Sequence, residues 1–269
     1  MTQRLDAAVA ARGLARSRTH AAHLIESGLV SVDGSGVVKV STRVDEAAVI
    51  EVAGADHYVS RAAHKLIAGL DAFGIAVAGR RALDMGASTG GFTQVLRERG
   101  ATPVIAVDVG HGQLSPVIAT DPHVIAVEGF NVRYMSPAVL AAASGITEPP
   151  QLVTGDLSFI SLDHVLAPVA EVIDPEGDVV LLIKPQFEVG RTGVREGLVT
   201  DPGRRADAVA GVLWSAWDAG MGTCGLIASP IIGTHGNAEF VAHFRVRGDD
   251  PATGNPTEWL STVNRLAGA

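Results

Sequence analysis

The sequence predicts a doubly wound α/β domain preceded by a small α+β unit. Three observations support this prediction. From about residue 61 onward, short apolar runs alternate with helical stretches, the order typical of α/β sheets. The first 50 residues instead predict two short helices followed by short strands, and the pattern changes at Ala53-Gly54. With 269 residues, 47% of them hydrophobic and 19% charged, the chain can bury a large core, which excludes a wholly disordered protein.

The first unit is delimited by helix breakers and turn residues. Leu5 and Val9 recur at helical spacing until Gly13, and Ser17 is a suitable N-cap for a second helix that ends before Gly28. A strand is expected from 29 into the turn at 33–36, with further strands at 37–40 and 49–52. A unit of this size is marginal alone, so we expect it to be joined to a larger domain.

The second part is a regular alternation of strands and helices. The expected strands are 82–85, 104–107, 124–127, 152–154, 179–183, 224–228 and 240–246. The expected helices are 61–73, 91–99, 112–119, 138–143, 162–173, 203–219 and 256–266. The predicted boundaries are 1–55 for the small unit, 56–60 for a linker and 61–269 for the α/β domain.

Charge is unevenly distributed along the chain. The 21 Lys and Arg against 29 Asp and Glu give a formal net charge of −8, which by itself does not indicate a polyanion partner. The first two predicted helices are locally basic, however. The basic residues there are Arg4, Arg12, Arg16 and Arg18. Asp6 is the only acidic residue before Glu26. Phosphate contact depends on such a local patch more than on net charge.

Three features of the composition exclude whole classes of protein. The single cysteine, Cys224, cannot form an intrachain disulfide or a thiolate cluster, which favours a reducing compartment, and we expect the cytoplasm. No run approaches the roughly 20 apolar residues of a membrane span, and no signal peptide is expected. The nine histidines show no convincing ligand spacing, so we predict no metal site.

A glycine loop follows the first predicted strand of the α/β domain, where residues 81–92 read Arg-Ala-Leu-Asp-Met-Gly-Ala-Ser-Thr-Gly-Gly-Phe. Glycines there let a ligand approach the backbone, and the following helix N-terminus favours polar or anionic groups. Ser88 stands where a dinucleotide fingerprint needs its second glycine, and the Lys-Ser/Thr of a P-loop is absent. The order D-x-G-x-x-x-G instead favours S-adenosylmethionine. The predicted cofactor residues of this loop are Asp84, Gly86, Ala87, Ser88, Thr89, Gly90 and Gly91.

Two polar residues at the ends of the next two strands extend this prediction. Asp108 lies 22 residues after Gly86, where an acidic side chain in such folds accepts hydrogen bonds from ribose hydroxyls. Asn131 follows the third strand, where its amide can bind an adenine edge. Each residue alone would also fit a loop or cap role, but with the glycine loop they indicate a nucleoside-type cofactor.

Lysine is rare in this chain, with three residues against 18 arginines. Lys184 directly follows the strand 179–183, at the edge where open α/β sheets build their sites, and Lys65 lies in the helix that enters the domain. Asp156 follows the fourth strand, and Glu239 precedes the last one. A deprotonated lysine can take a proton from a weak acid such as a ribose 2′-hydroxyl, whereas arginine stays protonated. Any one Lys–carboxylate pair, taken alone, is better explained as an ordinary ion pair.

Together these residues resemble known families. The pattern Arg4-Leu-Asp, Gly13-Leu-Ala-Arg-Ser-Arg and Leu24-Ile-Glu-Ser-Gly-Leu-Val-Ser-Val-Asp-Gly resembles the S4 RNA-binding domain. The remainder resembles FtsJ-like ribose methyltransferases, most specifically in Ser60-Arg-Ala-Ala-His-Lys-Leu, Leu83-Asp-Met-Gly-Ala-Ser-Thr-Gly-Gly-Phe-Thr, Asp108-Val-Gly-His-Gly-Gln-Leu, Asp156-Leu-Ser-Phe-Ile-Ser and Lys184-Pro-Gln-Phe-Glu. In this order the two domains are similar to the TlyA family of rRNA cytidine 2′-O-methyltransferases, historically called haemolysins.

The resemblance implies a Rossmann-like sheet and specific roles. It implies a catalytic tetrad of Lys65, Asp156, Lys184 and Glu239. It also implies that S-adenosylmethionine is held by the glycine loop, Asp108 and Asn131, with Phe159 beside it. The partner it implies is rRNA or a ribosomal subunit, not membrane or DNA, with phosphates contacted by Arg4, Arg12, Arg16, Arg18 and Lys39. The linker departs from the family, since 56–59 read Asp-His-Tyr-Val where Arg and Trp are often found.

Three alternative functions remain at this stage. A haemolysin would need an apolar or amphipathic membrane segment, which the sequence does not show, and dye release from liposomes would test it. An RNA-binding assembly factor would keep the cofactor fold without turnover, but the intact tetrad disfavours this. A small-molecule methyltransferase is disfavoured by the N-terminal unit.

Overall fold

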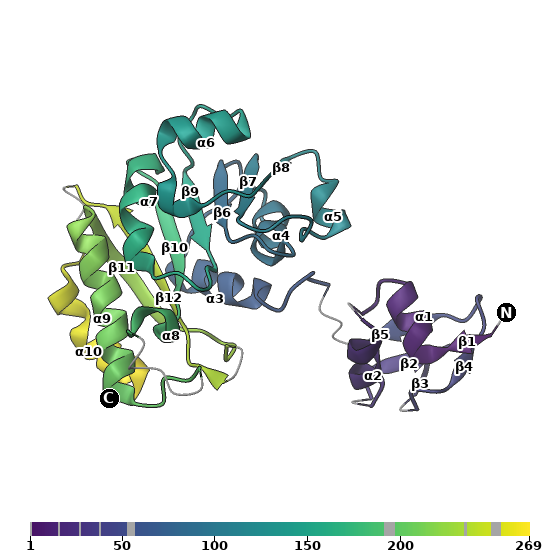
Figure 1. Ribbon diagram of the computed structural model, residues 1–269. Helices are drawn as coiled ribbons and strands as arrows, with labels where there is room; N and C mark the ends of the chain where they lie inside the picture. The colour runs from purple at the N-terminus through teal and green to yellow at the C-terminus, as the bar shows by residue number, and fades with distance from the viewer. Residues whose placement is uncertain are drawn as a thin grey trace. The chain divides into compact units, whose positions relative to one another are not determined.

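The computed structural model describes residues 2–15, 17–26, 28–37, 39–52, 57–190, 197–233, 236–248 and 254–269. The chain divides into two compact units, Met1–Val59 and Ser60–Ala269 (Figure 1). Two positions singled out from the sequence, Arg16 and the linker residue Asp56, lie outside the described residues.

The N-terminal unit is a small α+β fold with a single apolar core. Its elements are β1 (Gln3–Arg4), α1 (Leu5–Ala11), α2 (Arg18–Glu26), β2 (Val30–Val32), β3 (Ser35–Gly36), β4 (Arg43–Val44) and β5 (Ile50–Val52). The strands form two antiparallel sheets, with β1 beside β4 and β2 between β3 and β5. The core contains Leu5 and Val9 of the first helix and Leu24 and Ile25 of the second, as the apolar spacing predicts.

The strand expected at 37–40 is not found at its described residues 37, 39 and 40, and Val38 lies outside the described residues; the strand in this region is β3, which directly follows a turn. β2 and β3 are joined by the two residues Asp33 and Gly34, with φ angles of 49° and 78°. Positive φ at both positions is the geometry of a tight type I′ hairpin, in which pairing resumes directly after the turn. Val32 therefore pairs with Ser35 and Ser31 with Gly36, and the Val37 N–H still donates to the Val30 carbonyl oxygen over 2.8 Å.

The C-terminal unit contains a seven-stranded sheet in the order β11-β12-β10-β9-β6-β7-β8. Neighbouring strands from β10 to β8 are parallel, and β12 is antiparallel to both β10 and β11. The strands are β6 (Ala82–Met85), β7 (Val104–Asp108), β8 (Val124–Glu128), β9 (Leu152–Gly155), β10 (Asp178–Ile183), β11 (Met221–Ala228) and β12 (Phe240–Val246). All seven predicted strands are present, so the predicted α/β class is confirmed.

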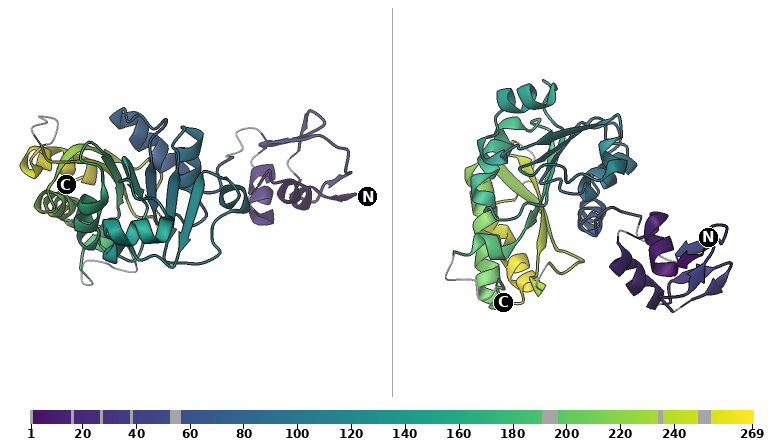
Figure 2. Two further views of the ribbon diagram at one scale, coloured as in Figure 1. Left: turned by 90° about the horizontal axis from the view of Figure 1, so that it is seen from above. Right: turned by 45° about the vertical axis from the view of Figure 1, so that its right-hand side comes forward.

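Helices cover both faces of this sheet (Figures 1 and 2). They are α3 (Ala63–Phe73), α4 (Gly91–Glu98), α5 (Pro116–Ala119), α6 (Pro137–Ser144), α7 (Leu166–Val172), α8 (Pro185–Glu188), α9 (Pro202–Asp218) and α10 (Pro256–Ala267), with short 3-10 turns η1 (Val132–Tyr134) and η2 (Leu162–His164). On one side, α3 packs on α4 and on β10 to β12; on the other, α7 packs on α9, and α9 on α10. The expected helix at 162–173 is interrupted at Val165.

The helix expected at 112–119 begins later than predicted, at Pro116. Ser115, its N-cap, is extended with ψ of 140°, because the residue before a proline avoids the helical region. Residues 109–115 form a loop instead, in which the N–H of Gly110 donates to Asp108. This loop contributes to the cavity described below.

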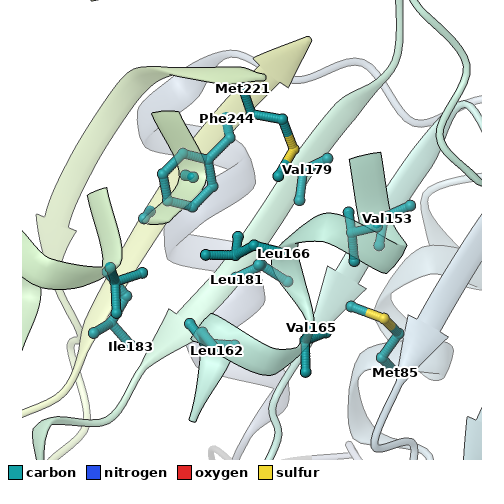
Figure 3. Packing of buried hydrophobic residues seen from close by; sticks show 14 of the residues in the cluster. Met85, Val153, Leu162, Val165, Leu166, Val179, Leu181, Ile183, Met221 and Phe244 are labelled. Atoms are coloured by element: carbon teal, nitrogen blue, oxygen red, sulfur yellow. The ribbon is translucent and has the colours of Figure 1, made fainter. Parts of the chain in front are cut away.

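The core lies between the sheet and the α7–α9 layer. Leu181, Val153 and Met85 project from three adjacent parallel strands towards Leu162, Val165 and Leu166, as Figure 3 shows. All six are at most 2% exposed. Such continuous apolar burial is typical of parallel strands covered on both faces. It also anchors the segment between β9 and α7, which carries part of the candidate site.

Candidate active site

Charged side chains from distant parts of the chain meet at the carboxyl edge of the sheet. Asp156 directly follows β9, and Lys184 directly follows β10, its parallel neighbour. Glu239 precedes β12, which is antiparallel to β10 with Phe240 opposite Ile183. The start of β12 therefore lies at the same edge as the end of β10. This arrangement is the switch-point location where open α/β sheets bind ligands.

The close approach of α3 to the sheet brings a fourth group to this edge. Gly69 faces β12 so closely that a Cβ atom there would lie 2.8 Å from Cγ1 of Val241. Residues i and i+4 share a helix face, so Lys65 lies on the same side of α3 as Gly69. Lys65 is accordingly 6% exposed and reaches the carboxylates at the sheet edge.

The four side chains form a chain of alternating charge. The Nζ atom of Lys65 donates to Oε2 of Glu239 over 2.6 Å and lies 3.7 Å from Oδ2 of Asp156. The other carboxylate oxygen of Asp156, Oδ1, lies 2.7 Å from Nζ of Lys184. Lys184 in turn donates to Oγ of Ser158 over 2.8 Å. The structure thus brings together the four residues that the sequence singled out, with Asp156 between two ammonium groups.

Burial makes this pairing necessary. Lys65, Lys184 and Glu239 are 6%, 7% and 4% exposed. A charge removed from water is tolerated only when opposite charges and hydrogen bonds compensate it. Two cations and two anions balance, so each group depends on its neighbours for its position.

The glycine loop lies beside these charges. Gly86 and Gly90 have φ angles of 76° and 96°, a backbone conformation that glycine adopts without strain. Gly91 lies so close to Ser60 that an added Cβ would be 2.8 Å from the Ser60 Cβ atom. A cavity of about 170 Å³ is lined by Ser60, Ala62, Gly86, Ala87, Ser88, Thr89, Gly91, Phe92, Asp156, Ser158 and Lys184. The loop and two members of the charged chain therefore share one cavity.

Asp108 holds the rim of a second, smaller cavity. One carboxylate oxygen accepts the Ser88 N–H and the other accepts the Gly110 N–H, both at 2.8 Å. This cavity is also lined by Ala87, Ser88, Gln113 and Glu128, so it adjoins the first at the glycine loop. A carboxylate has about four acceptor positions, which leaves capacity for ribose hydroxyls. Asn131 is exposed and uses its side-chain oxygen to cap η1.

Asp84 lies deeper than the residues that line the two cavities. It is 1% exposed and lines neither cavity; instead it accepts hydrogen bonds from Thr93 on α4 over 2.6 Å and from Thr154 on β9 over 3.2 Å. Burial raises the pKa of Asp84 to about 7, against the hydrogen bonds from both threonines. Contact of Asp84 with the cofactor stays a prediction; the structure shows that Asp84 joins β9 and α4, which flank the loop.

Phe159 also departs from its expected position. Its side chain is 92% exposed, its φ angle is 65°, and its ring lies 5.3 Å from the ring of Phe187. It lines neither cavity. The structure therefore places Phe159 on the surface of the loop after Asp156, and the expectation that it lies beside the cofactor is not supported by this geometry.

Sequence reasoning missed two polar residues of this region. Ser158 accepts the Lys184 hydrogen bond, and Glu188 accepts hydrogen bonds from Ser161 and Leu162. Burial raises the pKa of Glu188, against the hydrogen bond from Ser161. Their signal was their place in the two motifs quoted above, since Ser158 is the third residue of Asp156-Leu-Ser-Phe-Ile-Ser and Glu188 the last of Lys184-Pro-Gln-Phe-Glu.

The basic residues of the N-terminal unit are partly engaged within it. Asp6 pairs with Arg4 at 3.0 Å and with Arg18 at 2.9 Å, and the Arg4 hydrogen bond leads in lowering the pKa of Asp6 to about 2. Arg12 donates to the carbonyl oxygens of Asp45, Glu46 and Ala48. Lys39 is exposed. Phosphate contact by these residues stays a prediction, and for Arg12 a structural role is visible as well.

Two absences hold for the residues that the structure describes. Within them, no three His, Cys, Asp or Glu side chains gather into a group that could hold a metal ion. No helix among these residues combines the length and apolarity that a bilayer span requires.

Comparison with known proteins identifies both units. The S4 domain model matches residues 3–50, and the FtsJ-like methyltransferase model matches residues 58–246. The 16S/23S rRNA (cytidine-2′-O)-methyltransferase TlyA of Mycobacterium tuberculosis is 45% identical over 91% of this chain and 91% of its own length. Hemolysin A of Brachyspira hyodysenteriae is 36% identical over 90% of this chain and 99% of its own length.

A solved structure gives the same result for the fold. A Streptococcus thermophilus protein named as a hemolysin superposes with a TM-score of 0.74 at 35% identity, covering 99% of this chain and 96% of that one. The matches span both units and include the segments that carry the glycine loop and the charged chain. The chain therefore belongs to the TlyA family of FtsJ-like methyltransferases and carries an S4 domain in its N-terminal unit.

Proposed function

We propose that this protein transfers the methyl group of S-adenosylmethionine to the ribose 2′-hydroxyl of cytidine in 16S rRNA, 23S rRNA or both. The observation that carries the proposal is the shared cavity, in which the glycine loop faces Asp156 and Lys184. The name of the mycobacterial relative supports the substrate, the atom and the nucleotide. A cytoplasmic location follows from that substrate.

The residues around the loop fit S-adenosylmethionine. Gly86, Ala87, Ser88, Thr89 and Gly91 line the cavity, and the positive φ of Gly86 gives the loop its sharp turn beside Asp156. Asp108 at the adjoining cavity would accept the ribose hydroxyls. When bound, the cofactor supplies a methyl group on a positively charged sulfur, which a hydroxyl oxygen can attack.

Lys184 is the member of the charged chain best placed to act on the acceptor. Lys184 lines the cavity, whereas Lys65 does not. In its neutral form Lys184 would take the 2′-hydroxyl proton as the methyl carbon leaves the sulfur, which becomes a neutral thioether, and bonds to the ribose oxygen. Asp156, 2.7 Å away, would stabilise the resulting ammonium. Lys65 and Glu239 would hold Asp156 in place from behind.

The N-terminal unit would position the rRNA. Basic side chains that contact phosphates orient a nucleic acid without reading its sequence. Lys39 and the exposed faces of Arg4 and Arg18, whose side chains are 46% and 61% exposed, supply such groups. The S4 domain match supports this role.

The test is transfer of tritiated methyl from S-adenosylmethionine to purified 30S subunits, 50S subunits and naked rRNA. Wild-type protein should yield 2′-O-methylcytidine after nuclease digestion. Lys184→Ala should lower the rate by about 100-fold or more, the usual contribution of a general base. Lys184→Arg, which keeps charge and length, should not restore activity. Both variants should still bind the cofactor in calorimetry.

Two outcomes would contradict the proposal. Full methylation by Lys184→Ala would remove Lys184 from the chemistry. Cofactor binding without label on any rRNA would instead favour an RNA-binding factor that does not turn over.

A further inference from the structure

Two segments at the sheet edge run side by side and touch repeatedly. The first is the irregular stretch 156–162, which connects β9 to η2 and is called here the β9 loop. The second is 184–188, which comprises Lys184 and α8. At one end, Lys184 lies 2.7 Å from Asp156 and donates to Ser158. At the other end, Glu188 contacts the β9 loop.

Glu188 contacts the β9 loop through two hydrogen bonds. The Ser161 hydroxyl donates to Oε2 of Glu188 over 2.6 Å, and the Leu162 N–H donates to Oε1 over 3.1 Å. Both carboxylate oxygens are thereby engaged by consecutive residues. The Leu162 side chain, 2% exposed, lies in the core beside Val165 and Leu181 (Figure 3). Glu188 thus ties α8 to the anchored end of the β9 loop.

The middle of the β9 loop is strained. Phe159 has a φ angle of 65°, which a bulky L-residue adopts only when its surroundings impose it. Phe159 is 92% exposed and its ring lies tilted at 5.3 Å from the ring of Phe187, so burial of the side chain does not supply the constraint. The constraint comes from the two ends, at Asp156 and at Ser161–Leu162. Release of the second end would let Phe159 relax and displace its neighbour Ser158.

We infer that Glu188 is a positioning residue for the methyl transfer, which holds the β9 loop so that Ser158 and Asp156 keep Lys184 aligned with the cavity. The inference rests on the proposed function and adds a residue outside the charged chain. Glu188 itself does not line the cavity. It acts through Ser158, whose oxygen accepts the Lys184 hydrogen bond. A displacement of about 1 Å at a reacting group can lower a rate by about 100-fold.

The test compares Glu188→Gln with Glu171→Gln in the full-length protein. Glu171 is an exposed glutamate on α7 and serves as the matched control. Glu188→Gln should lower kcat for rRNA methylation by about 10- to 100-fold. The Kd for S-adenosylmethionine should stay within about twofold, because the glycine loop is untouched. Glu171→Gln should resemble wild type in both.

A second measurement does not depend on activity. Hydrogen–deuterium exchange should speed up in peptides covering 156–162 of Glu188→Gln and remain unchanged in peptides covering the glycine loop. Ser161→Ala should show a smaller effect of the same kind. The double variant should be no worse than Glu188→Gln alone, because both substitutions break one contact. A general loss of stability would instead speed exchange throughout and add between the variants.

The outcomes separate this inference from the proposed function. Unchanged exchange in 156–162, or kcat within twofold of the Glu171→Gln value, overturns the positioning role. If the wild-type protein methylates no rRNA while Glu188→Gln loosens only the β9 loop, the proposed function and its kinetic consequence fail. The contact between Glu188 and the loop then stands as a structural one.

Discussion

Lys65 and Glu239 are 174 residues apart in the sequence, yet the Lys65 Nζ atom donates to Oε2 of Glu239 over 2.6 Å. Both side chains are almost fully buried, at 6% and 4% exposure. The pair connects the first helix of the domain to the start of the last strand and places Lys65 behind Asp156. Through this pair, Lys65 and Glu239 support Asp156 and Lys184, the two members of the charged chain that line the cavity.

Removal of the negative charge of Glu239 should impair catalysis without unfolding the protein. Glu239→Gln keeps the size of the side chain but leaves the buried Lys65 ammonium with Asp156 as its nearest carboxylate, 3.7 Å away. Asp156 is then drawn towards Lys65 and away from Lys184. We expect kcat to fall by about 10- to 100-fold with little change in cofactor affinity, measured by methyl transfer and calorimetry. Wild-type kcat in Glu239→Gln would show that Lys65 needs no second partner.

Gly233→Ala should reproduce that defect although residue 233 has no functional group. A Cβ atom at Gly233 would lie 2.2 Å from Oε1 of Glu239, so the carboxylate must move. The movement should break the hydrogen bond to Lys65 and lower methyl transfer as strongly as Glu239→Gln. Gly211→Ala is the matched control, since nothing lies within 4 Å of its added Cβ and it replaces a helical glycine. Equal activity in the two alanine variants would argue against this steric coupling.

Asp84 should make the protein less stable as the pH rises. Its pKa is about 7 in the folded chain and 3.8 as a free side chain, so between these values the folded state binds more protons than the unfolded state. Stability contributed by Asp84 is therefore lost as the pH rises from about 4 to about 7. Asp84→Asn should raise Tm more at pH 8 than at pH 5, measured by calorimetry. A larger gain at pH 5 would contradict the assignment.

Asp178 should make the protein less stable as the pH falls below about 4, which is the opposite of the trend expected from Asp84. Burial alone would raise the pKa of Asp178, but hydrogen bonds from His243, Arg80 and Arg245 hold it well below the usual 3.8. A depressed pKa contributes stability above pH 4 that disappears as the pH falls further. Asp178→Asn should cost about 3 kcal/mol in urea unfolding at pH 7, because it leaves the partly buried guanidinium groups of Arg80 and Arg245 without the carboxylate that they share. The difference should shrink at pH 3, and a constant difference would refute it.

Arg12 should matter for the stability of the N-terminal unit, and Lys39 for rRNA binding. Arg12 donates to three carbonyl oxygens of 45–48, so Arg12→Ala should loosen the N-terminal unit, visible as faster hydrogen exchange in 45–52. Lys39 has no such network and is exposed. Lys39→Ala should leave exchange unchanged but weaken rRNA binding. Binding should also release about one ion fewer, which is measured as a smaller slope of log affinity against log salt concentration. Unaltered salt dependence in Lys39→Ala would remove it from the RNA contacts.

The sequence by itself determined the fold class and the strands of the α/β domain, and it supplied the candidate site residues. Local information was sufficient there. Buried parallel strands are continuous apolar runs, the glycine loop is contiguous, and lysine is so rare that Lys65 and Lys184 stand out. The family resemblance then joined these residues into one site, which the geometry of the four side chains supports.

The tertiary structure alone decided how the site is held. Asp84 and Phe159 were expected at the cofactor because they belong to the right motifs, but their burial and exposure depend on packing against other strands and helices. The roles of Ser158 and Glu188 likewise depend on two segments that lie side by side because β9 and β10 are parallel neighbours. Contacts across a sheet join residues far apart in the chain, so periodicity and spacing along one strand carry no record of them.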